Sequence, residues 1–237
     1  MLARHAHRGG DALDWQAIGL SLRLSLATTA VLFVIGLPLA RWLAFTTWRG
    51  RFLVEAVVAL PLVLPPTVLG FYVLVAFSPR SPLGHAYLSL TGSTLPFTFT
   101  GLLLASVLYS LPFAVQPFVA AFSAVDRRLV EASWSLGVSR TATFYRVVLP
   151  LSRAGVVTGA VLSFAHTMGE FGVVLMVGGN LPGVTRTVSI SIYDQVQALD
   201  YAAATATAGF LLAVSFIVLA ITYGMHRRPG AAWPLAS

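Results

Sequence analysis

The residues of this sequence that could do chemistry are the ionisable ones inside long apolar runs: Arg23, Glu55 and Glu170. A charged side chain within a membrane is costly and commonly marks a pathway or a partner. Glu55 follows Arg51 by four residues near the end of its run, so a surface ion pair explains it. Arg23 and Glu170 lie deeper, about 10 Å and 12 Å from the same face at 1.5 Å per residue. We therefore predict a buried, structural ion pair between Arg23 and Glu170.

Small and polar residues recur at helical spacing along the run that carries Glu170, so they share one helix face. Such a face either lets another helix pack closely or lines a water-filled path. Close packing suits the glycines Gly155 and Gly159. The candidates for a translocation pathway or gate are Ser163, His166, Gly169, Glu170, Phe171 and Gly172. We expect no metal site, because no second histidine lies near His166 in the sequence.

The string ALPLVLPPTVLG carries three prolines, Pro61, Pro65 and Pro66, within one apolar run. Proline lacks a backbone N–H and clashes with the carbonyl four residues back, so this run should kink or break. Such helices often only shape packing, but freed backbone groups that line a cavity can meet a passing ion. Pro65 and Pro66 therefore join the pathway candidates.

The stretch 123–153 carries five of the fifteen basic residues between nearly uncharged flanks. Ser123 with Asp126 fits a capping box that opens a helix, and Gly137 suits the left-handed residue that closes it. Ser139 can cap a second helix, which Pro150 would end. The pattern predicts a helix, a tight turn and a helix. An ordinary amphipathic loop is the alternative, because charge runs usually mark solvated faces.

The composition places the chain among membrane proteins, with 57% hydrophobic and only 10% charged residues over 237 positions. All fifteen basic residues are arginines, and there is no cysteine. A phosphate-binding P-loop needs its lysine, so ATP energy would have to enter through a partner. We expect no cofactor, and no nucleic-acid partner, because the arginines form no basic face with interleaved aromatics.

Five apolar runs are long enough to cross a bilayer, since a span needs roughly 20 residues. They cover residues 15–45, 52–77, 97–122, 154–177 and 201–223. The prediction is an all-α membrane protein, one transmembrane domain over 1–237, with residues 123–153 forming a cytoplasmic loop. With that loop inside, arginines favour an outer N-terminus and a cytoplasmic C-terminus. The inner arginines are Arg41, Arg49, Arg51, Arg127, Arg128, Arg140, Arg146, Arg153, Arg227 and Arg228, against Arg4, Arg8, Arg80 and Arg186 outside.

Several strings resemble the permease subunits of molybdate ABC transporters. They are LPLVLPPTVLGFY (60–72), the 123–153 stretch with its EAA-type spacing, and LSFAHTMGEFGVVLMVGGNLPGVTRT (162–187). The likeness covers nearly the whole chain from Trp15 onward. Ser133, Val147, His166 and Trp134 depart from the usual family pattern, at positions where Ala, Ile, Arg and Arg are common.

The resemblance implies a type I ABC importer permease in the inner (cytoplasmic) membrane, which translocates molybdate or tungstate. It implies a homodimer within membrane lipid, two ATP-binding subunits on the cytoplasmic side and an external solute-binding protein. The ATPase-coupling residues would be Glu131, Ala132, Ser133, Gly137, Leu149 and Pro150.

Other functions stay open at this point. An ion-coupled secondary transporter would also use broken helices and buried charges, although no inverted repeat is evident. A sulfate-type oxyanion permease shares many of the strings. A membrane enzyme is disfavoured, because Glu55 and Glu170 form no evident acid–base pair and no HExxH or GxSxG string occurs. A membrane anchor would leave the 123–153 pattern unexplained.

Overall fold

The computed structural model describes residues 13–226, and every regular element in this range is a helix. In chain order the elements are α1 (Trp15–Phe45), α2 (Arg51–Val63), α3 (Pro66–Ala76), α4 (Pro82–Thr91), α5 (Phe99–Ser123), α6 (Arg127–Ser135), α7 (Arg140–Thr143), the π-helical turn η1 (Phe144–Val148), α8 (Leu149–Leu151), α9 (Arg153–Met168), α10 (Gly172–Gly178), α11 (Val188–Gln197) and α12 (Tyr201–His226). The predicted all-α class is confirmed.

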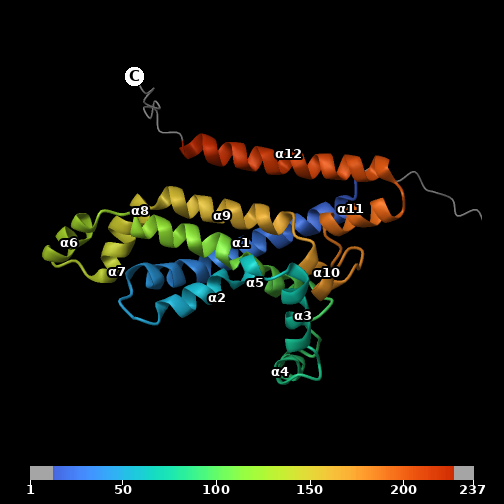
Figure 1. Ribbon diagram of the computed structural model, residues 1–237, viewed down its shortest axis with the longest axis horizontal. Coiled ribbons are helices and arrows are strands. Elements are labelled where there is room, and N and C mark those ends of the chain that lie inside the picture. Colours follow the sequence, from blue (N-terminus) through green and yellow to red (C-terminus); the bar gives the residue numbers. More distant parts are fainter. Residues whose placement is uncertain (1–12, 227–237) are drawn as a thin grey trace, which may run out of the picture.

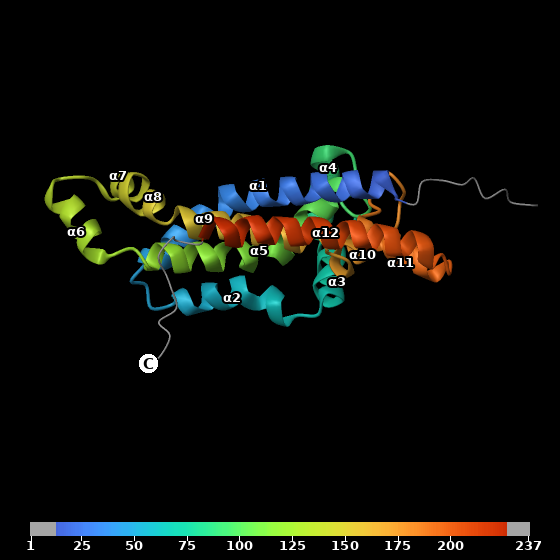
Figure 2. The same ribbon diagram turned by 90° about the horizontal axis from the view of Figure 1, so that it is seen from above.

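The helices α1, α5 and α9 lie side by side and form the centre of the fold (Figures 1 and 2). Many of the side chains between them are apolar and almost fully buried, among them Leu32, Val115 and Phe118. On α9, a Cβ added to Gly159 would lie 2.6 Å from the Phe118 ring. Small residues therefore let α9 approach α5 closely, as expected where membrane helices pack by contact.

The run 52–77 breaks between α2 and α3, whose axes differ by 113°. The amide of Leu64 still donates to the carbonyl of Leu60 at 3.1 Å. Pro65 and Pro66 have no N–H with which to continue the helix, and Pro66 instead starts α3, a position that tolerates proline. The predicted break is confirmed, and α3 and α4 turn away from the bundle (Figure 1).

The run 154–177 was predicted as one span, and this is wrong. The helix α9 ends at Met168, and α10 begins only at Gly172. Two glycines, Gly169 and Gly172, flank the break, and glycine is a poor helix former because it loses the most backbone entropy. Glu170 consequently lies in the break rather than on one helix face with Ser163 and His166.

In the described part of the chain, three helices are long and apolar enough to cross a membrane: α1, α5 and α12. Two bent pairs, α2 with α3 and the 140–151 segment with α9, raise the count to five if each is one span. The predicted number of five equals this upper count, but the fourth predicted span, 154–177, has other bounds than the bent pair over 140–168. The helix α12 lies along α9 and α11 at the edge of the bundle (Figures 1 and 2).

The 123–153 loop projects from one end of the molecule (Figure 2). Asp126 caps α6 by accepting from the amide of Arg128, and Ser139 caps α7 by accepting from the amide of Ala142. Gly137 has φ of +77°, the left-handed value predicted for the turn. The capping box is wrong in one part, since Ser123 is the last residue of α5 and the opening cap is Asp126 alone.

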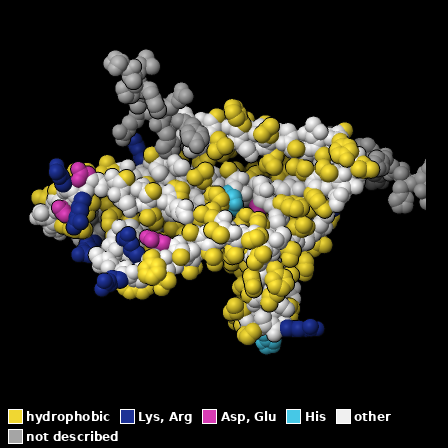
Figure 3. Space-filling view, in the orientation of Figure 1, with side chains coloured by type: hydrophobic (Ala, Val, Ile, Leu, Met, Phe, Trp, Pro, Cys, Tyr) yellow, Lys and Arg dark blue, Asp and Glu magenta, His cyan; other side chains and the backbone are white. Residues whose placement is uncertain are grey.

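Pro150 does not end the second helix of the loop, because the chain stays helical to Leu151 and turns by 74° into α9. The π-helical turn η1 ends at Val148, two residues before this proline. Such wider turns fit where a missing N–H has interrupted the regular α-helical hydrogen bonds. Arginines and acidic residues gather over this end of the molecule (Figure 3). Arg4, Arg8, Arg227 and Arg228, used in predicting the orientation, lie outside the described residues.

Candidate functional site: a cavity where two helix breaks meet

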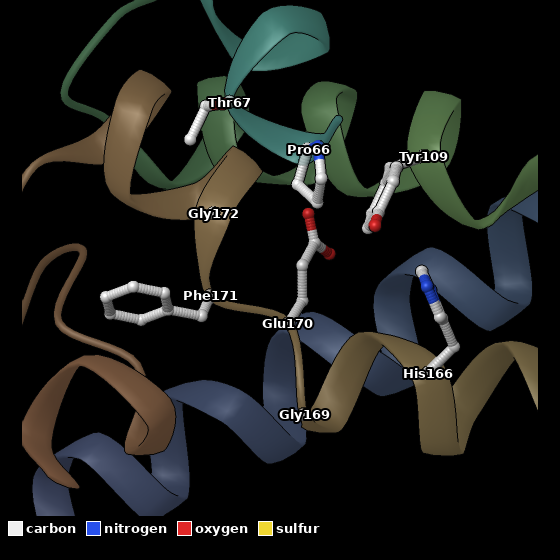
Figure 4. Close-up of a pocket in the computed structure, with 8 residues that line it drawn as sticks. All are labelled: Pro66, Thr67, Tyr109, His166, Gly169, Glu170, Phe171 and Gly172. Atoms are coloured by element: carbon white, nitrogen blue, oxygen red, sulfur yellow. The ribbon is translucent and has the colours of Figure 1, made fainter. Parts of the chain in front are cut away.

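A cavity of about 510 Å³ lies where the α2–α3 break faces the α9–α10 break. Figure 4 shows its lining residues: Pro66, Thr67, Tyr109, His166, Gly169, Glu170, Phe171 and Gly172. The sequence predicted six of these eight as pathway residues, since only Thr67 and Tyr109 were missed. Pro65 and Ser163 do not line the cavity. Pro65 forms the break itself, and the buried Ser163 hydroxyl donates within α9 to the carbonyl of Gly159.

The helices α3 and α10 pack so closely that two glycines, Gly172 on α10 and Gly70 on α3, leave no room for a side chain. A Cβ on Gly172 would lie 2.7 Å from the Cβ of Pro66, and one on Gly70 would lie 2.7 Å from the Cβ of Met176. The two short helices that follow the breaks are therefore in direct contact over their length. A movement at one break must be accompanied by a movement at the other.

Glu170 extends from the α9–α10 break towards the first residues of α3, and its carboxyl group lies between Pro66 and Tyr109 (Figure 4). The side chain is only 4% exposed, and neither carboxyl oxygen has a hydrogen-bond partner in the structure. The buried hydroxyl of Ser106 on α5 is a neighbouring polar group, but no hydrogen bond of ordinary geometry joins it to the carboxyl. A buried carboxyl without a partner is energetically costly and marks a functional group.

The predicted ion pair between Arg23 and Glu170 is not formed. The three ion pairs among residues 13–226 are Arg51 with Glu55, Arg127 with Glu131 and Arg186 with Asp194. Arg23 lies on the exposed face of α1, with its guanidinium 5.5 Å from the centre of the Phe99 ring. Equal depth along two helices does not fix the direction in which each side chain points. The predicted surface ion pair of Glu55 with Arg51 is confirmed, with 3.6 Å between Glu55 Oε1 and Arg51 Nε.

His166 is held against α5 by one hydrogen bond and two rings. Its Nδ1 shares a hydrogen bond of 2.9 Å with the Ser110 hydroxyl, which also lies 2.9 Å from the Thr167 hydroxyl. The imidazole stacks on Phe113 at 3.9 Å between ring centres and meets Tyr109 at 4.8 Å. His166 was predicted as a pathway residue and lines the cavity. The described residues include no group of side chains suited to a metal ion.

Tyr109 and Thr67 could have been found from the sequence. Ser106, Tyr109 and Ser110 fall within one turn of an otherwise apolar helix, which is the same signal that singled out His166 on α9. Thr67 directly follows the proline pair, at the first turn of the helix that Pro66 begins. The informative signals are thus polar residues within an otherwise apolar helix, as for Tyr109, and polar residues beside a predicted break, as for Thr67.

Five of the six predicted coupling residues divide between two surfaces, and the sixth, Ser133, is buried inside the 123–153 loop. Glu131, Ala132 and Gly137 are exposed on the 123–153 loop, and Glu131 accepts a 2.7 Å hydrogen bond from Arg127. Leu149 and Pro150 instead lie at the base of the loop, beside α9, where they line a second, apolar cavity of about 400 Å³. The loop also exposes large apolar side chains, with Leu136 at 83% exposure next to Gly137.

The broken spans, the cavity at their meeting point and the projecting loop together are typical of a membrane-spanning component of a transport system. The chain belongs to the family of binding-protein-dependent transport system inner membrane components, whose model matches residues 33–229.

Its relatives include the molybdenum transport system permease protein ModB of Azotobacter vinelandii, 52% identical over 90% of this chain and 95% of that protein. ModB of Escherichia coli K12 is 38% identical over 78% of this chain and 80% of that protein. Among solved structures, a bacterial alginate importer matches with a TM-score of 0.72, over 91% of this chain and 79% of that one, at 20% identity. The methionine transporter MetNI matches with a TM-score of 0.70, over 90% of this chain and 94% of that one, at 16% identity.

Proposed function

We propose that this chain is the membrane-spanning subunit of an ATP-driven importer that carries molybdate across the cytoplasmic membrane. One observation carries the substrate: the 52% identity to a molybdenum transport permease over 95% of that protein's length. Further molybdenum permeases, from Escherichia coli and Haemophilus influenzae, are 38% and 32% identical. Tungstate has nearly the same size and charge as molybdate, so the cavity would admit both.

The proposal assigns the 123–153 loop to the contact with an ATP-hydrolysing partner. Its exposed apolar side chains Leu129 and Leu136 suit burial in a groove of another protein. The loop is braced against the bundle by Arg41, which donates to the Thr141 hydroxyl at 3.3 Å and lies over the Phe144 ring at 4.8 Å. A braced loop can pass a push from the ATPase to α9. The chain itself has no lysine for a P-loop.

The assembly in this proposal is a homodimer with two ATPase subunits inside and a solute-binding protein outside. The N-terminus lies outside and the C-terminus in the cytoplasm, as the arginine distribution favours. Exposed apolar residues along α2 and α3, such as Phe52, Val57 and Phe71, would face lipid or the second copy. In alternating access, closure of the ATPase dimer would move the two loops, and the helix breaks would open and close the path.

Sulfate is the competing substrate, because a probable sulfate transport permease of Chlorokybus atmophyticus is 31% identical over 84% of this chain. The decisive test is uptake of labelled molybdate into proteoliposomes that contain this chain, its genomically neighbouring ATPase and its binding protein. We expect uptake that requires ATP and is blocked by tungstate but not by sulfate. Uptake driven by an ion gradient without the ATPase would overturn the proposal, and blockage by sulfate alone would reassign the substrate.

A further inference from the structure

We propose that the cavity between the two helix breaks is a transient binding site for a tetrahedral oxyanion, with Glu170 as a protonated, neutral hydrogen-bond donor. The inference rests on the proposed function, since it names the groups that would hold the transported anion partway across the membrane. Its elements are the N-terminus of α3, the carboxyl of Glu170 and the hydroxyl groups beside them.

The N-terminus of α3 supplies the positive end of a helix of eleven residues. Pro66 and Thr67, at this N-terminus, line the cavity. Pro66 has no N–H, and the amides of Val68 and Leu69 donate to the Pro65 carbonyl at 2.9 and 3.2 Å, so this N-terminus offers the Thr67 amide together with the helix dipole, which favours anions. Half-helices that begin at a break near the membrane centre commonly present this end to anionic substrates.

Glu170 is the second and independent observation. Its carboxyl group is nearly fully buried, points to this same helix N-terminus and has no hydrogen-bond partner. An ionised carboxylate would repel an oxyanion, and no arginine pairs with it in the described part of the chain. Ionised groups are not left buried without a cation, whereas a protonated carboxyl is tolerable and can donate. Apart from the neighbouring Ser106 hydroxyl, which makes no hydrogen bond of ordinary geometry to it, the carboxyl would find its partner in the oxyanion.

The cavity wall is mostly apolar, and its few remaining polar groups can donate hydrogen bonds without a fixed charge. Among the described residues, Tyr109 and His166 are the only other titratable ones that line it, from α5 and α9, while α3 and α10 contribute none. Hydroxyl groups of Thr67 and Tyr109 can donate to anion oxygens. A site without a fixed positive charge would hold the anion weakly, which allows release to the next step of transport.

The carboxyl oxygens are covered in this conformation, so the anion would reach them when α3 and α10 shift together, as one unit, away from α5. The close packing of Gly172 on Pro66 and of Gly70 on Met176 couples the two helices. One movement would therefore expose Glu170 and free the N-terminus of α3 together. The site would form only in the open state of the path.

The test compares Glu170→Gln with Glu170→Leu in the assembled transporter in proteoliposomes. Gln keeps a neutral donor, so molybdate uptake per ATP hydrolysed should fall by no more than about threefold, whereas Leu, which removes it, should lower that ratio about tenfold or more. ATP hydrolysis in both variants reports that the complex has assembled. Loss of uptake in Glu170→Gln would overturn the proposal, because it would mean that the charge is needed. A wild-type ratio in Glu170→Leu would overturn it as well.

A binding readout separates contact with the anion from a merely structural role. The chain has no cysteine, so Gly169→Cys places a single thiol in the cavity wall, where its Cβ would have no neighbour closer than 3.9 Å. Molybdate should slow the labelling of Cys at position 169 by a water-soluble thiol reagent in the Gly169→Cys variant and in its combination with Glu170→Gln. It should not slow the labelling in the combination with Glu170→Leu. Equal protection in all three proteins, or no protection in Gly169→Cys alone, would overturn the inference. If the unmodified complex carries no molybdate at all, the proposed function fails instead.

Discussion

The hydroxyl oxygens of Ser133 on α6 and Thr143 at the end of α7 lie 2.9 Å apart, and both side chains are buried. This hydrogen bond joins the two helices of the 123–153 loop. Ser133 stands where the EAA-type pattern commonly has alanine, a side chain that could not make this hydrogen bond. The bond ties the two helices together, which the proposed coupling role of the loop requires.

Ser133→Ala should weaken this link, because the Thr143 hydroxyl is left buried without a partner. The expected cost is about 1 kcal/mol, and molybdate uptake per ATP hydrolysed should fall by about twofold to fivefold. The double variant Ser133→Ala with Thr143→Val removes both hydroxyls and should recover most of the ratio. Additive losses in the double variant would show that the two hydroxyls act independently.

Gly137 tests the loop turn through backbone geometry alone. Its φ is +77°, yet a Cβ at this position would meet nothing within 4 Å. Gly137→Val should therefore strain the backbone by roughly 1–2 kcal/mol or more and uncouple ATP hydrolysis from uptake. Gly137→Asn is the matched control, since asparagine tolerates the left-handed region, and it should keep most of the coupling. Equal effects of Val and Asn would show that the side chain, not the turn, matters.

Gly172 and Gly169 flank the same break but differ in the space around them. A Cβ on Gly172 would lie 2.7 Å from the Cβ of Pro66, whereas one on Gly169 would have its nearest neighbour at 3.9 Å. Gly172→Ala should cost about 1–3 kcal/mol by overpacking and lower the Tm of the purified protein by several degrees. Gly169→Ala should leave the Tm nearly unchanged. Similar Tm values for the two variants would contradict the close packing of α3 on α10.

Arg23 and Glu170 should behave as independent residues. Arg23 is exposed over Phe99, and no ion pair joins it to Glu170. In a double-mutant cycle of Arg23→Gln and Glu170→Gln, the effects on uptake should add to within about 0.5 kcal/mol. A larger coupling energy, or rescue by exchanging the two charges, would restore the ion pair predicted from the sequence.

Local chemistry made much of this fold predictable. The Pro65–Pro66 pair predicted the α2–α3 break because proline lacks an N–H, and Gly137 predicted the left-handed turn because other residues are strained there. The second break, at Gly169 to Phe171, was missed because glycine only lowers helix propensity, and tertiary contacts decide whether the helix continues. The close contact of Gly172 with Pro66, which accompanies that break, joins residues far apart in the sequence.

The candidate site was predictable in its residue types but not in its pairings. Depth along a helix follows from the sequence at about 1.5 Å per residue, and this placed Glu170 inside the membrane. The direction of a side chain depends on helix rotation and packing, so Arg23 was paired with Glu170 wrongly. Tyr109 was missed because α5 was treated only as an apolar span, although Ser106 and Ser110 mark a polar side of it.

The orientation of the chain can be tested with single cysteines, because the sequence contains none of its own. Leu136 lies in the 123–153 loop and Leu90 in α4, and both are highly exposed, at 83% and 86%. With the loop in the cytoplasm, a membrane-impermeant thiol reagent added to intact cells should label Leu90→Cys and not Leu136→Cys, and opening the membrane should make both react. The reverse pattern would put the loop outside, where no ATPase could dock, and would refute the proposed coupling role.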